Sequence, residues 1–142
     1  MCRGDENMKK IIALYGAANK GKTTTLNILV DLLAVVSDYY NIERYYDSKA
    51  MFVINKKNIG VCTPGDNQEE IKKNIDFFNK NECEIIITAT RTKGDGVTEL
   101  EKFTKKQGIE IDWIIKENNP ELNGLVAADI FRRIINEIYP KC

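Results

Sequence analysis

Glycines, a lysine and threonines stand close together near the start of the chain, in the order Gly16-Ala17-Ala18-Asn19-Lys20-Gly21-Lys22-Thr23-Thr24. Glycine allows the sharp backbone turns that aim successive N–H groups at one point, and such a concave row of N–H groups binds anions. A lysine adds a mobile positive charge, and a threonine hydroxyl is a suitable ligand for Mg²⁺. These residue types at this spacing predict a site for a polyphosphate and its metal ion.

The segment matches the pattern Gly-x-x-x-x-Gly-Lys-(Ser/Thr) in full, after a short apolar run and before a helix-forming segment. This setting between strand and helix is the one in which the pattern carries its function, so the chain resembles the P-loop (Walker A) nucleoside triphosphatases. The resemblance implies that Lys22 acts in catalysis and that Thr23 binds Mg²⁺. For Thr24, contact with the α-phosphate and packing in the first helical turn stay open. The implied phosphate-binding residues are Gly16, Ala17, Ala18, Asn19, Lys20, Gly21, Lys22, Thr23 and Thr24.

The segments around the motif alternate between strand and helix. Short continuous apolar runs are typical of strands covered on both faces, and they lie at 11–15, 84–89 and 109–115. Apolar residues at three- and four-residue spacing predict helices at 22–37, 68–79, 97–107 and 122–139. Two further apolar runs, 50–54 and 59–62, flank a short polar turn and predict a β-hairpin. The tyrosine-rich residues 39–47 are expected to be irregular.

This alternation predicts an α/β chain with the three-layer fold of the P-loop NTPases. We expect a mostly parallel sheet of about five strands, one antiparallel edge strand contributed by the hairpin, and helices on both faces. No linker or repeat interrupts the pattern, so a single nucleotide-binding domain is predicted over residues 8–142. Residues 1–7 (MCRGDEN) read as a flexible leader or a remnant of expression, because Met8 begins a sequence like a natural start.

Composition excludes several classes of site. The chain has no histidine, which removes Ser-His-Asp triads, Cys-His pairs and histidine zinc sites. Its 21 basic and 21 acidic residues give a formal net charge of zero, so nothing indicates a nucleic-acid or anionic-membrane partner. The four cysteines form no Cys-x-x-Cys pair and are expected to be reduced thiols. No apolar run is long enough to span a bilayer, and we expect a cytoplasmic protein.

A P-loop enzyme also needs a carboxylate near its Mg²⁺. The sequence Thr63-Pro64-Gly65-Asp66 follows the hairpin and resembles the Asp-x-x-Gly segment of small GTPases, but Cys62 stands where their aspartate would be. We therefore expect Asp66 to act in catalysis and to associate with the metal or its water. A helix N-cap role for Asp66 is the alternative, and Asp47 is a weaker metal candidate.

The segment Thr92-Lys93-Gly94-Asp95 matches the Thr-Lys-x-Asp motif that reads guanine in GTPases. It follows the first parallel strand after the hairpin, whereas GTPases place it after the second. The shift of one strand, about 4.8 Å, opposes a guanine site and favours ATP over GTP. Arg91 or Lys93 in the same loop is expected to neutralise charge on a transferring phosphoryl group or to bind an acceptor; a solvated basic loop is the alternative.

Three functions are consistent with these residues. The first is Mg²⁺-dependent binding and hydrolysis of a nucleoside triphosphate, controlled by a protein partner, with slow turnover because no catalytic base stands out. The second is a kinase that transfers the γ-phosphate to a nucleotide or another small-molecule acceptor. The third is a non-catalytic module in which residues 39–46 respond to the γ-phosphate.

Overall fold

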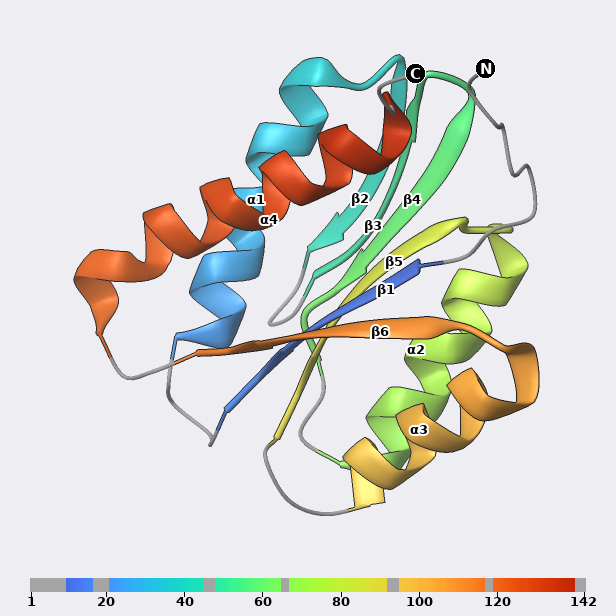
Figure 1. The fold of residues 1–142 in the computed structure, drawn as a ribbon. Coiled ribbons are helices and arrows are strands. Elements are labelled where there is room, and N and C mark those ends of the chain that lie inside the picture. The colour runs from blue at the N-terminus through green and yellow to red at the C-terminus, as the bar shows by residue number, and fades with distance from the viewer. Residues whose placement is uncertain are drawn as a thin grey trace.

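The protein is described by a computed structural model that places residues 10–16, 21–44, 48–64, 67–91, 95–116 and 119–139, without the side chains of residues 95 and 96. Within these ranges a mixed sheet of six strands lies between two pairs of helices (Figure 1). The predicted α/β class, with helices on both faces of a sheet, is confirmed. None of the helices in these ranges is long and apolar enough to cross a membrane.

Strands and helices alternate over most of the chain. The strands are β1 (Lys10–Tyr15), β2 (Tyr39–Arg44), β3 (Ser48–Ile54), β4 (Lys57–Cys62), β5 (Ile85–Thr90) and β6 (Glu110–Ile115). The α-helices are α1 (Lys22–Val36), α2 (Gln68–Lys80), α3 (Asp95–Gln107) and α4 (Asn123–Ile138), and a short 3₁₀ turn, η1 (Pro120–Leu122), precedes α4.

The sheet has the order β2-β3-β4-β5-β1-β6. Strands β4, β5, β1 and β6 run parallel to one another, whereas β3 is antiparallel to both β2 and β4. The antiparallel strand of the hairpin was predicted at the edge of the sheet, and this position is wrong. The antiparallel strand exists, but β2 covers its outer side, and the sheet is only partly parallel.

The prediction of an irregular segment is wrong for Tyr39–Arg44, which forms the edge strand β2. The strand is exposed along its length except at the half-buried Ile42. An edge strand needs only backbone pairing on one side, here with β3, so it can carry polar residues that hide the strand pattern. Arg44 also bonds Asp31 of α1. Residues 45–47, which include Asp47, lie outside the described residues.

The predicted hairpin is confirmed as β3 and β4. The turn between them consists of Asn55 and Lys56, which have φ values of 51° and 65°. Two-residue hairpin turns whose twist matches the strands need positive φ at both positions, and asparagine tolerates this conformation well. The turn fixes the register in which Ile54 faces Lys57.

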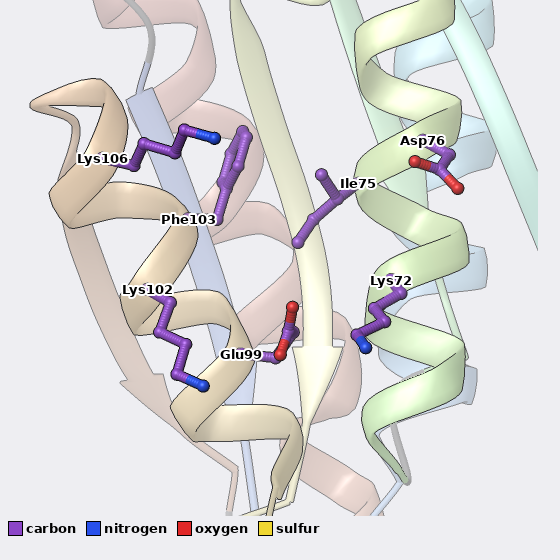
Figure 2. Close-up of a pocket in the computed structure, with 7 residues that line it drawn as sticks. All are labelled: Lys72, Ile75, Asp76, Glu99, Lys102, Phe103 and Lys106. Carbon is purple, nitrogen blue, oxygen red and sulfur yellow. The ribbon is translucent and has the colours of Figure 1, made fainter.

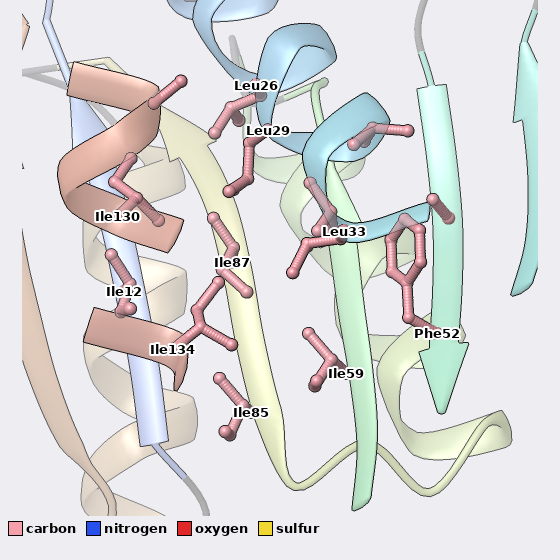
Figure 3. Packing of buried hydrophobic residues seen from close by; sticks show 14 of the residues in the cluster. Ile12, Leu26, Leu29, Leu33, Phe52, Ile59, Ile85, Ile87, Ile130 and Ile134 are labelled. Atoms are coloured by element: carbon pink, nitrogen blue, oxygen red, sulfur yellow. The ribbon is translucent and has the colours of Figure 1, made fainter. Parts of the chain in front are cut away.

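The core lies on both faces of the sheet. On one face, α1 and α4 pack against the strands through Leu29, Leu33, Ile130 and Ile134, which are buried together (Figure 3). On the other face, α2 and α3 cover a smaller apolar cluster. Because the apolar face of α1 is locked into this core, the start of the helix at Lys22 is held in a fixed position relative to β1.

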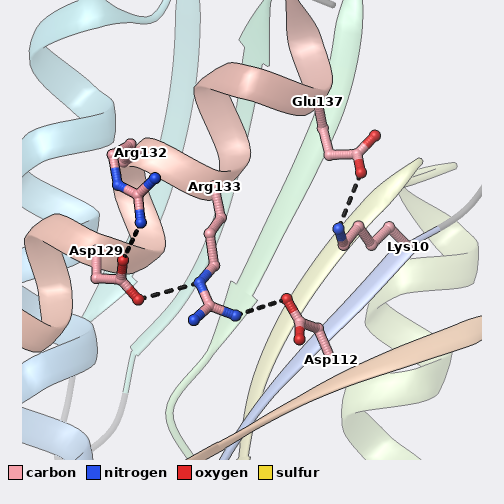
Figure 4. Close-up of polar contacts among 6 residues, drawn as sticks. All are labelled: Lys10, Asp112, Asp129, Arg132, Arg133 and Glu137. Atoms are coloured by element: carbon pink, nitrogen blue, oxygen red, sulfur yellow. Dashed lines mark hydrogen bonds and ion pairs between the residues drawn. The ribbon is translucent and has the colours of Figure 1, made fainter.

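Ion pairs fasten α4 to the sheet (Figure 4). Arg133 donates to Asp112 of β6 at 2.8 Å and to Asp129 of its own helix at 3.0 Å. The hydrogen bond from Arg132 lowers the pKa of Asp129, and the bond to Asp112 raises the pKa of Arg133. At the other end of α4, Lys10 bonds Glu137 at 2.9 Å.

The lowered pKa of Asp129 predicts a loss of stability in acid. An aspartate with a depressed folded pKa stabilises the fold above its unfolded pKa of about 3.9, and the effect disappears as the pH falls through the folded value. We expect Asp129→Asn to cost at most about 1 kcal/mol at pH 7, because the pair is partly exposed. The difference in melting temperature from the wild type should vanish in acid, once Asp129 is protonated in the folded chain as well. Asp38→Asn, at an exposed aspartate, is the control, and a difference that persists in acid would contradict this assignment.

Candidate functional site

The carboxyl ends of the four parallel strands meet at one edge of the sheet. Gly16 follows β1, Thr63 follows β4, Arg91 follows β5 and Lys116 follows β6. In open α/β sheets, this edge is where ligands bind. The glycine-rich segment, residues 16–24, leaves β1 at this edge and returns as α1.

Lys22 lies at the centre of the described part of this edge. Its side chain is only 7% exposed, and its ammonium nitrogen donates to the carbonyl oxygens of Gly16 at 2.7 Å and Thr90 at 3.0 Å. The N–H of Gly16 donates to the same Thr90 carbonyl at 3.2 Å. These bonds hold a buried positive charge between the ends of β1 and β5.

Gly21 forms the entry to α1 in the left-handed region, with φ 81° and ψ 18°. A side chain at this position would be strained, so glycine is required by the backbone. No side chain of the described residues caps this helix end, and the first turn of α1 contains no acidic residue. The first N–H groups of a helix have no partner within it, and the helix dipole favours an anion there.

The first turn of α1 contributes hydroxyl groups to the same place. Thr23 is half-buried, Thr24 is exposed, and Thr25 is buried with its Oγ1 donating to the Gly21 carbonyl at 2.7 Å. This last bond ties the left-handed turn to the helix that follows it. The remaining members of the predicted phosphate-binding set, residues 17–20, lie outside the described residues.

A short polar network supports the end of β4. The Ser48 hydroxyl donates to Asn27 of α1 at 2.7 Å, and the Ser48 N–H donates to the Thr63 hydroxyl oxygen at 2.7 Å. The Thr63 N–H in turn donates to the Ser48 carbonyl at 3.0 Å. The network joins α1, β3 and β4 at the edge where the glycine-rich segment lies.

Asp66 lies outside the described residues, together with Gly65, but Pro64 and Asn67 on either side of this gap bond residues of α2. Asn74 donates to the Pro64 carbonyl at 2.6 Å. Asn67 caps α2 by accepting the Glu70 N–H at 2.9 Å, so the cap role weighed for Asp66 belongs to its neighbour.

Cys62 occupies the position compared above with an aspartate of small GTPases. Its side chain is fully buried, and this burial raises the pKa of its thiol far above the ordinary value. The thiol is therefore neutral at physiological pH and unsuited to hold Mg²⁺, which prefers oxygen ligands. Within the described residues, no group of three or more carboxylates, cysteines or histidines could hold a metal.

Arg91 is exposed at the carboxyl end of β5, and β5 pairs directly with β1. The loop that carries Thr92-Lys93-Gly94-Asp95 therefore starts one strand from β1. Residues 92–94 of this loop, and the side chain of Asp95, lie outside the described part.

Sequence reasoning missed Asn123, the first residue of α4. Its side chain is buried at 7% exposure, and a Cβ built on Gly21 would lie 3.0 Å from its Oδ1. Among the described residues, the Oδ1 of Asn123 has no hydrogen-bond partner. An asparagine at the start of an apolar helix reads as an ordinary helix boundary, so no sequence signal linked it to the glycine-rich segment 102 positions (123 − 21) earlier.

A separate groove of about 340 Å³ lies between α2 and α3 on the opposite face of the sheet from α1 (Figure 2). Ile75 and Phe103 form its apolar part. Its charged residues have both signs and are Lys72, Asp76, Glu99, Lys102 and Lys106. None of the residues predicted for phosphate binding lines this groove.

Comparison with known proteins assigns no family. No family model matches the chain, and no curated protein matches it. Among solved structures, the chain is similar to purine nucleoside phosphorylase from Toxoplasma gondii, crystallised with immucillin-H, at 12% identity and a TM-score of 0.33. The match covers 87% of this chain and 66% of that chain. A likeness this low carries no argument about fold or function.

Proposed function

We propose that the chain binds a nucleoside triphosphate with Mg²⁺ through residues 16–24, as a P-loop nucleotide-binding domain that hydrolyses its ligand. The observation that supports this most is the buried ammonium group of Lys22 at the start of α1. This positive charge lies at the positive end of the dipole of α1, and the first turn of that helix contains no acidic residue. The charge and the helix end would both attract a bound polyphosphate.

Different residues of the site would bind different parts of the ligand. The N–H groups at the start of α1 would donate to phosphate oxygens, and Lys22 would exchange its carbonyl partners for the more strongly attracting phosphate. Thr23 would hold Mg²⁺ through its hydroxyl, with Asp66 as the associated carboxylate. When bound, Mg²⁺ neutralises charge on the phosphates during phosphoryl transfer.

ATP is the favoured ligand. The strand that precedes the Thr-Lys-x-Asp segment, β5, is the direct neighbour of β1, whereas in GTPases the corresponding strand is one position farther from the phosphate-binding strand. Since strands are spaced by about 4.8 Å, a base held at the usual distance from the phosphates would not meet this loop.

Transfer to a small acceptor is the second candidate. Arg91 is exposed at the same edge of the sheet, next to the Thr90 carbonyl that accepts from Lys22. A cation in this place suits charge on a transferring phosphoryl group or an anionic acceptor. Hydrolysis remains the first candidate because the described residues include no arginine-rich lid.

A nucleotide panel tests the proposal. Binding of ATP and GTP is measured by calorimetry with Mg²⁺ and with EDTA, and phosphate release is followed with and without nucleoside monophosphates. Tight ATP binding with Mg²⁺-dependent release supports the hydrolase, and labelled phosphate on an acceptor supports the kinase. Binding with neither reaction indicates a sensing module. Failure of both nucleotides to bind would refute the proposed function.

A further inference from the structure

Asn123 is a buried polar side chain that the fold itself does not use fully. It is 93% buried (100% − 7%), and its Oδ1 has no partner among the described atoms. It lies against Gly21, where an added Cβ would be 3.0 Å from Oδ1 and 3.1 Å from Nδ2. The side chain is therefore aimed at the left-handed turn from which α1 starts.

An unpaired acceptor at this depth is unfavourable, because it has lost its water without gaining a protein donor. The following turns of α4 place Ala127 and Ile130 in the core, so an apolar residue at position 123 would suit the ligand-free fold. Buried polar groups without partners are rare in folded proteins and need a specific explanation.

We propose that Asn123 is a positioning residue of the phosphate site. In the phosphate-bound form, its Oδ1 accepts a backbone N–H at the Gly21 turn and holds the start of α1 in the conformation that receives the phosphates. This inference rests on the proposed function. In this proposal, α4 supports a site formed by β1 and α1, and α4 is itself held to β6 by Arg133.

The contact explains why Gly21 and Asn123 fit each other. A side chain at residue 21 would meet the amide head of Asn123, and the backbone there is already left-handed. Gly21 supplies the left-handed backbone of the turn, and the amide group of Asn123 packs against it. Because the bond is to backbone and not to the nucleoside, it acts on every ligand that carries the polyphosphate.

The test uses Asn123→Leu, which keeps the approximate shape but removes the amide, together with Asn123→Ala, which carries less risk of overpacking. Asn136→Ala, at an exposed position of the same helix, is the matched control. For each variant, the melting temperature is measured without ligand. Dissociation constants are measured for Mg·ATP and for Mg·tripolyphosphate, which has no nucleoside.

We expect the leucine variant to melt at or above the wild-type temperature, since it removes an unsatisfied acceptor. Both dissociation constants should rise about tenfold, the size of one hydrogen bond. Unchanged dissociation constants would overturn the inference while leaving the proposed function intact. A lower melting temperature in both position-123 variants would indicate a merely structural role. A higher dissociation constant for Mg·ATP alone would indicate that Asn123 contacts the nucleoside instead. Failure of the wild type to bind either ligand would refute both proposals.

Discussion

Replacement of Lys22 by methionine should abolish measurable binding of Mg·ATP, with a loss of at least about 100-fold, or 2.7 kcal/mol. Methionine keeps the apolar stem of the side chain and removes only the charged head. In the folded chain this head donates to the carbonyl oxygens of Gly16 and Thr90. Charge-assisted bonds to phosphate are about twice as strong as neutral ones, so their loss should dominate the affinity.

The control for this variant is Lys10→Met, on β1, the strand that precedes the glycine-rich segment. Lys10 stands at the start of β1, bonds Glu137 of α4, and is distant in register from the glycine-rich segment at the end of the strand. Both variants lose one positive charge, so a general electrostatic effect would weaken binding equally in both. We expect calorimetry to show wild-type affinity in Lys10→Met. Unchanged affinity for Mg·ATP in a folded Lys22→Met protein would show that the glycine-rich segment does not bind the phosphates.

The parts of the fold that were predicted correctly are those in which local pattern and tertiary packing agree. Leu26, Leu29 and Leu33 repeat at helical spacing, and all three are buried in α1. The Asn55–Lys56 turn has the residues and length that a hairpin requires, and it forms as expected. The start of α1 at Lys22 could be read directly from the glycine that precedes it.

The missed features depend on contacts between distant parts of the chain. Strand β2 has a polar sequence because water covers it on both faces, and only its pairing with β3 makes it a strand. The approach of Asn123 to Gly21 depends on how α4 packs on α1, which no local spacing records. The phosphate-binding role of residues 16–24 stays a prediction from the sequence pattern, whereas the position of Asn123 beside Gly21 is visible only in the fold.

Gly60→Ala should be the most destabilising single-methyl addition among the described glycines. Gly60 lies in β4, and an added Cβ would be 2.6 Å from the Phe78 ring and 2.7 Å from Cys83 Sγ. Phe78 and Cys83 are at most 2% exposed, so neither can move aside without disturbing the core of α2. Overpacking of this kind costs about 3 kcal/mol, which should lower the melting temperature by roughly 10 °C.

The same substitution at Gly124 separates this steric effect from any general effect of replacing glycine. An added Cβ there meets nothing within 4 Å, and the residue is helical, so Gly124→Ala should gain up to about 1 kcal/mol. If the Phe78 ring is the obstacle, the Phe78→Leu change should cost less in the Gly60→Ala background than alone, because each relieves the other. Additive losses in urea denaturation, or a cost below about 0.5 kcal/mol for Gly60→Ala, would show that β4 and α2 have room to separate.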